Sequence, residues 1–442
     1  MRNATFALLV GFLAVSGIAS QAQVPASFFD MQMEHATVTG EPWPVDSFYG
    51  IRLWDTATAW AVINTAPGQY DWSMLDAWLA AAKNHNVDVL YCFGRTPQWA
   101  SANPNDRICA SSPGSCDPPN DLNTDGSGTN KHWQDFVTAI AKHVNDPTYL
   151  QTHAPIKYWE MWNEAGNPGR WHPVSEKAGI AQMLRMNTDA RNIILSFDST
   201  SQIVSPSVGI KVVQETGWMR DYLKAKGGNQ FDMVGIHSYL QTQGVPPVPE
   251  DYLRFIKSFT KNVLHPYHQD KKPLWDTEAS WGIATCCNFT DQDLQAGFVA
   301  RYYLMHWFGG TDRYYWYAWN DTPAGTLWVA NNQKIWEKGT LLKPGKAYAQ
   351  IYKWMVGNSV DQSCAPQGTV WACNVTGPNN FLGQIVWDTS QTCSDGTCTY
   401  SNYTYNPQYV QYVNLLGGVF QLSGGTVQIG YEPIFLQNQG QK

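Results

Sequence analysis

The feature that most constrains the fold is an alternation of short β-type runs and helical segments between residues 26 and 355. This rhythm is typical of parallel sheets and barrels, in which a helix joins each strand to the next. An open doubly wound sheet is less favoured, because no glycine-rich phosphate loop follows the first run. The β-type runs number eight, which is the count that closes a (β/α)8 TIM barrel: residues 28–33, 50–54, 87–93, 156–162, 203–208, 233–239, 274–278 and 314–319.

The intervening helices each carry one apolar stripe, as expected for helices that lie against a sheet. One stripe comprises Leu75, Trp78, Leu79 and Ala82, and another comprises Trp133, Phe136, Val137, Ile140, Ala141 and Val144.

The pattern changes after residue 356 to alternating strands with no convincing helix, which predicts a C-terminal β-sandwich accessory domain. Its expected strands are residues 369–375, 381–387, 397–403, 409–415 and 426–436. The predicted organisation is therefore a signal peptide at 1–22, a catalytic barrel at 23–356 and a sandwich at 357–442. A strand from residues 23–30 could also join the sandwich.

The first residues resemble a secretory signal. Arg2 supplies the positive start, residues 6–18 the apolar stretch, and residues 20–22 a small-x-small cleavage site. A membrane anchor is the less favoured alternative, because the stretch is short for a bilayer span. We expect a secreted or periplasmic protein with no membrane contact after cleavage.

Eight of the nine cysteines lie near a neighbour, and export makes disulfides plausible. The neighbours are Cys109 and Cys116, Cys286 and Cys287, Cys364 and Cys373, and Cys393 and Cys398. The adjacent pair Cys286-Cys287 could close a small ring, or each could pair elsewhere. Cys92 lies in an apolar run and is expected to stay reduced.

Charge and spacing exclude several classes of partner. Only 15% of the residues are charged, against about 25% in an average globular protein. The net charge is −7 without clustered basic residues, so nucleic acid is not expected as a partner. The cysteine and histidine spacings fit no zinc pattern, and we expect neither metal nor cofactor.

Two glutamates stand where a barrel carries its chemistry. Reactive side chains of barrels lie at the C-terminal ends of strands, and the fourth and seventh runs end at Glu164 and Glu278. A proton donor and a second carboxylate facing each other are what glycosidic cleavage requires. Glu160, four residues before Glu164, is expected to lie deeper in the barrel as a structural partner of Arg52.

These residues resemble a known group of enzymes. The segment Trp162-Asn163-Glu164 and the pair Thr277-Glu278 resemble the clan A glycoside hydrolases, and Phe93 to Ser101 is similar to glycoside hydrolase family 39. The resemblance covers nearly the whole mature chain. One departure is Ala165, which stands where family 39 typically has proline, so a closely related family is the alternative.

The resemblance implies specific roles. Glu164 is then the general acid and base, and Glu278 is the nucleophile of a configuration-retaining reaction. Such a reaction needs carboxyl groups about 5–5.5 Å apart. We expect aromatic walls and the charge of Glu278 to raise the pKa of Glu164, while donors keep Glu278 ionised.

Further residues are expected to bind substrate or to hold the glutamates. The resemblance assigns Asn163 to a sugar hydroxyl, Tyr239 to a hydrogen bond with the nucleophile, and Arg52 to the cation on the second strand. His237 is expected to contact sugar hydroxyls or Glu164, or to be a core histidine. Trp319 is the expected floor for the sugar ring, with Trp316 as the alternative. Trp99 and Trp281 are expected to line further subsites, although any of these tryptophans could instead be core.

The predicted function is that of a secreted retaining β-glycosidase acting on plant or microbial polysaccharide or oligosaccharide. Xyloside, arabinoside, glucoside and mannoside substrates all suit these residues, and the long segment 102–130 favours a polymer. A catalytically silent carbohydrate-binding relative is one alternative. A metal-dependent barrel hydrolase using His237 is the other.

Overall fold

The computed structural model describes residues 22–34, 43–320, 324–332 and 335–441. Of the predicted signal peptide, only residue 22 lies among the described residues. No helix in these ranges is long and apolar enough to cross a membrane.

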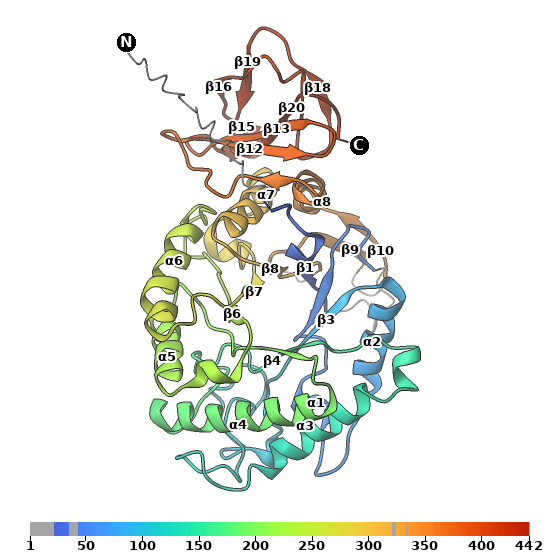
Figure 1. Cartoon of the computed structure of the whole chain (residues 1–442), viewed down its shortest axis with the longest axis vertical. Coiled ribbons are helices and arrows are strands. Elements are labelled where there is room, and N and C mark those ends of the chain that lie inside the picture. Colours follow the sequence, from blue (N-terminus) through green and yellow to red (C-terminus); the bar gives the residue numbers. More distant parts are fainter. Residues whose placement is uncertain (1–21, 35–42, 321–323, 333–334, 442) are drawn as a thin grey trace, which may run out of the picture.

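The first part of the chain forms the predicted barrel (Figure 1). Its parallel sheet has the strand order β5-β4-β3-β2-β1-β8-β7-β6, and a parallel bridge between Val204 and Met233 joins the two ends. Each strand falls on one of the eight predicted runs, which confirms the fold class. The strands are β1 (Phe29–Gln32), β2 (Gly50–Leu53), β3 (Asp88–Cys92), β4 (Tyr158–Glu160), β5 (Gln202–Val204), β6 (Val234–Ile236), β7 (Leu274–Ala279) and β8 (Arg313–Trp316).

Helices surround this sheet in Figure 1. The two predicted apolar stripes, on α2 and α3, are buried as expected. Burial of such a stripe against the sheet is the main source of stability for helices of this length. The helices are α1 (Trp60–Ile63), α2 (Ser73–His85), α3 (Lys131–Val144), α4 (Glu176–Phe197), α5 (Val213–Lys224), α6 (Asp251–Phe259), α7 (Gln292–Phe308) and α8 (Lys343–Met355).

The last part of the chain is built from antiparallel sheets. The larger sheet has the strand order β11-β12-β13-β20-β17-β18, and the pair β16-β19 lies apart from it. The predicted run 426–436 is two strands, because Gly430 to Pro433 interrupt it and proline cannot donate to a ladder. The strands are β11 (Ser359–Val360), β12 (Val370–Gly377), β13 (Phe381–Asp388), β14 (Cys393–Ser394), β15 (Thr397–Cys398), β16 (Ser401–Thr404), β17 (Gln411–Val413), β18 (Val419–Gln421), β19 (Thr426–Ile429) and β20 (Ile434–Gln437).

A hairpin of β9 (Trp328–Asn332) and β10 (Ile335–Leu341), which was not predicted, lies between β8 and α8. Residues 29–32 belong to the barrel as β1, and no strand from residues 23–30 enters the six-stranded sheet. Val24 instead forms a parallel bridge with Val356, where the barrel part gives way to the sandwich.

The sandwich packs against α7 and α8 (Figure 1). The indole N–H of Trp307 on α7 donates to Val360 O at 2.9 Å. The guanidinium of Arg301 pairs with Glu250, and Glu250 also accepts a hydrogen bond from Trp387 of the sandwich at 3.0 Å. Buried apolar side chains of the two parts form one continuous cluster.

Three disulfides are formed within the described residues: Cys109–Cys116, Cys364–Cys373 and Cys393–Cys398. Cys92 is a buried free thiol, as predicted. Cys286 and Cys287 are also free thiols, so the adjacent pair is open in this structure.

Candidate active site

The structure brings Glu164 and Glu278 together at the C-terminal end of the barrel. A carboxylate oxygen of each lies within 4.8 Å of the other and of a ring nitrogen of His237. Glu278 is on β7, whereas Glu164 follows β4 with a left-handed backbone, φ +50°. Such a conformation strains a residue with a side chain. Ser207, after β5, holds it in place, because its hydroxyl oxygen accepts from Glu164 N at 3.1 Å.

Both oxygens of Glu278 have donors. Arg52 Nη1 lies 2.7 Å from one oxygen, and the Tyr239 hydroxyl donates to the other at 3.0 Å. Burial raises the pKa of Glu278, and the charges of His237 and Arg52 lower it. The net direction is upward from the ordinary value.

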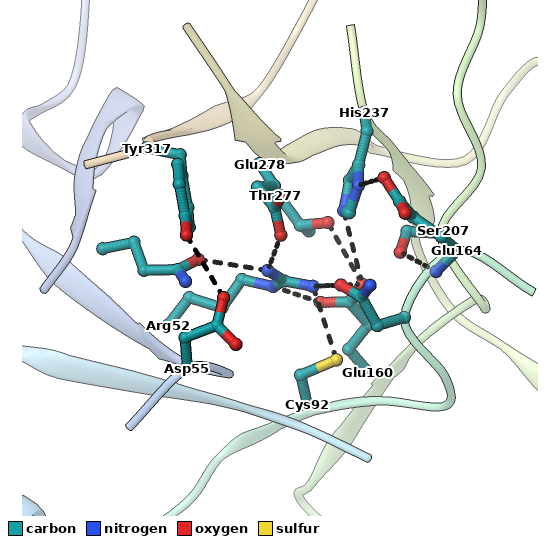
Figure 2. A network of polar contacts seen from close by, with 12 residues as sticks. Arg52, Asp55, Cys92, Glu160, Glu164, Ser207, His237, Thr277, Glu278 and Tyr317 are labelled. Atoms are coloured by element: carbon teal, nitrogen blue, oxygen red, sulfur yellow. Dashed lines mark hydrogen bonds and ion pairs between the residues drawn. The ribbon is translucent and has the colours of Figure 1, made fainter. Parts of the chain in front are cut away.

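Arg52 lies at the centre of the site and forms hydrogen bonds with several of its side chains (Figure 2). The side chain is fully buried on β2, and its Nε lies 2.7 Å from a carboxylate oxygen of Glu160. The prediction that Glu160 is a structural partner of Arg52 is therefore confirmed. Arg52 also donates to Asn163 Oδ1 at 2.6 Å and to Gln32 Oε1 at 3.1 Å. A permanently charged, five-donor side chain suits this position, since several acceptors converge on it.

His237 lies against Glu164, with its Nδ1 3.1 Å from Glu164 Oε1 (Figure 2). Burial raises the pKa of Glu164, but the hydrogen bond and charge of His237, with Arg170 and Asn167, outweigh it and lower the pKa to about 2. This is opposite to the expected direction. The pKa of His237 is raised, because the charges of Glu278 and Glu164 exceed the effect of burial. Both shifts favour a protonated His237 beside an ionised Glu164.

The predicted tryptophans lie at different depths. Trp319 is next to the site, because its backbone N–H donates to Gln32 O at 2.9 Å. Trp316 packs on Trp281 at 5.3 Å, with its indole N–H bonded to Gly325 O. The exposed fractions are 1% for Trp319 and 0% for Trp316, so neither ring has an open face, and the sugar-floor role stays a prediction.

Trp281 and Trp99 form no hydrogen bond with either glutamate within the described residues. Trp281 is almost fully buried among other aromatic rings, and Trp99 sits on the loop after β3, where its N–H donates to Asn64 O at 2.9 Å. Their subsite roles also stay predictions.

The chain has informative similarities to known proteins. Residues 188–348 match the family model described as glycosyl hydrolase catalytic core. A family 39 glycoside hydrolase from Bacteroides cellulosilyticus WH2 has a similar structure, with 17% identity, a TM-score of 0.60, and coverage of 88% of this chain and 75% of that one. No curated protein matches the sequence.

A second similar structure is a monomeric beta-xylosidase from Caulobacter crescentus CB15, with 15% identity, a TM-score of 0.62, and coverage of 94% of this chain and 97% of the other. A GH39 enzyme from Xanthomonas axonopodis pv. citri follows with 14% identity, a TM-score of 0.61 and 95% coverage of both chains. These findings support a clan A glycoside hydrolase, similar to family 39. At sequence identities of 14–17%, the structural similarity shows a shared fold and nothing more.

Several residues around the glutamates were not predicted. Gln32 and Ser207 stand at or near the C-terminal ends of predicted strands, so the strand-end rule applied to all eight runs would have found both. Asn167 donates to Glu164 Oε2 at 3.1 Å, and Arg170 lies 3.8 Å from the same oxygen. Their loop gave no signal beyond its nearness in sequence to Glu164.

Tyr317 is a further aromatic residue that was not predicted as part of the site. Its hydroxyl donates to Asp55 Oδ2 at 3.2 Å, and its ring packs edge-on to Tyr239, 6.4 Å between centroids. Unlike Trp319, it is only half-buried.

Proposed function

We propose that the protein is a secreted retaining β-glycosidase that hydrolyses polysaccharide or oligosaccharide by double displacement. The observation that carries the proposal is the approach of the Glu164 and Glu278 carboxylate oxygens to within 4.8 Å. Retaining enzymes hold their two carboxyl groups about 5–5.5 Å apart, whereas inverting enzymes leave room for a water at about 6.5–9.5 Å.

Glu278 acts as the nucleophile. Arg52 and Tyr239 fix both of its oxygens, so the carboxylate is aimed before substrate arrives. Its attack on the anomeric carbon forms a glycosyl ester and releases the leaving-group oxygen. Arg52 also stabilises the ionised form, which is the reactive one.

Glu164 receives a proton from His237 through the 3.1 Å contact and passes it to the leaving-group oxygen, which leaves Glu164 ionised and His237 neutral. After the first product departs, Glu164 accepts a proton from the water that attacks the ester. One proton therefore moves between substrate, Glu164 and His237 in each half of the reaction. Asn163, which Arg52 holds by its Oδ1, leaves its amide N–H groups for a sugar hydroxyl.

The export and substrate parts of the proposal have separate support. Three disulfides favour an oxidising compartment, as secretion provides. β-Xylosides are the first substrates to test, because one similar structure is named a beta-xylosidase.

The test is turnover of aryl β-glycosides, with the anomeric form of the first product followed by proton NMR. We expect the β-anomer first, and loss of turnover in Glu278→Gln with sugar binding intact. First appearance of the α-anomer, or full turnover by Glu278→Gln, would refute the mechanism.

A metal-dependent reaction has one observation in its favour, the cluster of Glu164, His237 and Glu278. The guanidinium of Arg52, 2.7 Å from Glu278, opposes a divalent cation at the same carboxylate. Turnover that persists in EDTA supports the glycosidase mechanism given above, and turnover that EDTA abolishes supports the metal-dependent one.

A further inference from the structure

A cavity of about 550 Å³ lies between the loop that follows β3 and the loop that follows β4. Both loops leave C-terminal ends of barrel strands, so the cavity is at the same end of the barrel as the two glutamates. Apolar wall residues include Pro118, Leu122 and Pro173, and polar ones include Asp117 and Gln182. The volume is within the range of small-molecule sites.

Two buried acceptors in this cavity lack donors among the described residues. Gln182 is 4% exposed, and its Nε2 donates to Leu122 O at 3.2 Å, which leaves Oε1 without a partner. Asp117 is also 4% exposed, and the polar neighbour of its carboxylate among the described residues is the Sγ of Cys109 at 3.6 Å, a disulfide sulfur with no hydrogen. A buried polar group without a partner costs about 1–3 kcal/mol, so a ligand with donors is favoured here.

Asp117 has no ion-pair partner within 4.0 Å among the described residues. Burial, with the neighbouring charge of Asp106, raises the pKa of Asp117 to about 7, although the charge of His172 lowers it in part. The ring of His172 pairs with Asp106 at 2.5 Å instead of with Asp117. The cavity therefore presents acceptors and no free cation of its own among the described side chains.

A single loop connects this cavity to Glu164. Arg170 lies 3.8 Å from Glu164 and donates to Ser111 Oγ at 3.2 Å. Two residues further on, His172 lines the cavity, and its backbone N–H donates to Cys116 O at 2.7 Å. Since the general acid acts on the leaving-group oxygen, the loop that carries Glu164 and Arg170 is on the leaving-group side of the substrate, and His172 of the same loop lines the cavity.

We propose that this cavity is a distal subsite that binds one sugar unit on the leaving-group side of a substrate chain. Sugar hydroxyls donate to Gln182 Oε1 and to the Asp117 carboxylate, and a C–H face of the sugar packs on the proline walls. The proposal rests on the proposed glycosidase function and makes the substrate an oligosaccharide or polysaccharide long enough to reach both sites. A single ion would leave most of the volume unfilled.

The test is a variant in which a larger side chain occupies the rim of the cavity. Val174 is 84% exposed and lines it, so Val174→Trp is expected to fold normally. Val213→Trp is the matched control, because Val213 is 85% exposed and lines a different cavity. Substrates are xylo-, gluco- and manno-oligosaccharides of two to six units and the corresponding aryl β-glycosides.

We expect Val174→Trp to lower kcat/KM for the longer oligosaccharides about tenfold, mainly through KM, the equivalent of one or two hydrogen bonds. Aryl glycosides, which do not reach the cavity, are expected to keep their kinetic constants. Gln182→Leu is expected to act in the same direction, with its melting temperature as a check on folding.

Equal kcat/KM values of Val174→Trp and Val213→Trp on the longer oligosaccharides would overturn the distal subsite. A wild type whose kcat/KM does not rise with chain length would also overturn it. A chain-length preference that requires added Ca²⁺ would assign the acceptors to a cation and also overturn it. Failure of the wild type on every aryl glycoside and oligosaccharide would instead reject the proposed function.

Discussion

At the scale of single residues, the site is organised by one cation and one shared proton. Arg52 fixes Glu278, Glu160, Asn163 and Gln32 at once, and His237 shares its proton with Glu164. The negative charges of Glu160, Glu164 and Glu278 are thus compensated in part before substrate binds. Buried charges are costly unless they are paired. Replacement of Arg52 or His237 therefore leaves at least one buried carboxylate without its partner.

Replacement of Glu164 by Gln is predicted to depend on the leaving group. An acidic aryl leaving group departs without proton donation, whereas a sugar alkoxide needs it. We expect kcat/KM to fall about 10²–10⁴-fold on oligosaccharides and much less on activated aryl glycosides. Equal losses on both kinds of substrate would contradict the acid role.

The pH profile of kcat/KM is predicted to be a bell. Glu278 must be ionised, and its pKa is raised, so the acidic limb lies above the ordinary value of 4.5. The shared proton must be present, and it is lost as pH rises through the raised pKa of His237, so the alkaline limb lies above 6.5.

Substitution of His237 by Asn tests the origin of the alkaline limb. Without the imidazolium, the limb reports the Glu164 carboxyl alone and is expected to move to lower pH. An unmoved limb would show that His237 does not hold the proton. The circular dichroism spectrum of the variant checks that the barrel is intact.

At the scale of elements, the loops after β3 and β4 are joined to each other as well as to the barrel. Ala110 N donates to Gly169 O at 2.9 Å, and the Cys109–Cys116 disulfide closes a short loop beside that contact. These bonds restrain the loop that carries Asn167 and Arg170 towards Glu164.

Removal of this disulfide by Cys109→Ala with Cys116→Ala is predicted to lower the free energy of unfolding by about 2–3 kcal/mol, from the entropy of a short closed loop. Urea unfolding measures the change. The matched control removes Cys364–Cys373, which should cost a similar amount and leave KM for oligosaccharides unchanged. An equal rise in KM for both variants would argue against a local role for the first disulfide.

Helices and strands could be predicted where neighbouring residues in the sequence specify them. All eight barrel strands lie in short β-type runs, and the α2 and α3 stripes follow the helical period, so the sequence was sufficient to predict them. The break at Gly430 to Pro433 was missed because a continuous alternation was assumed. The contact between Gln32 and Arg52 and the lowered pKa of Glu164 depend on distances between side chains of different strands. The sequence of one strand does not specify these distances.

At the scale of the whole molecule, the barrel and the sandwich share one apolar core. Trp307 and Trp354 of the barrel helices belong to the same buried cluster as Trp371 and Trp387. Removal of the sandwich would expose these large side chains, each of which contributes about 1.5–3 kcal/mol or more on burial.

The intact protein is therefore predicted to unfold in a single calorimetric transition, with equal van't Hoff and calorimetric enthalpies. A chain ending at residue 356 is expected to aggregate or to bind hydrophobic dyes. Two separate transitions in the intact protein, or a soluble and active truncated barrel, would contradict a shared core.

The position of β1 has a consequence for how the chain is made. β1 pairs with β2 on one side and with β8 on the other, and Val24 pairs with Val356. A polypeptide that emerges N-terminus first must keep one edge of its earliest strand unpaired until Arg313 to Trp316 have been delivered. Until then the unpaired edge is an aggregation hazard, and we expect the yield of native protein to depend on holding chaperones.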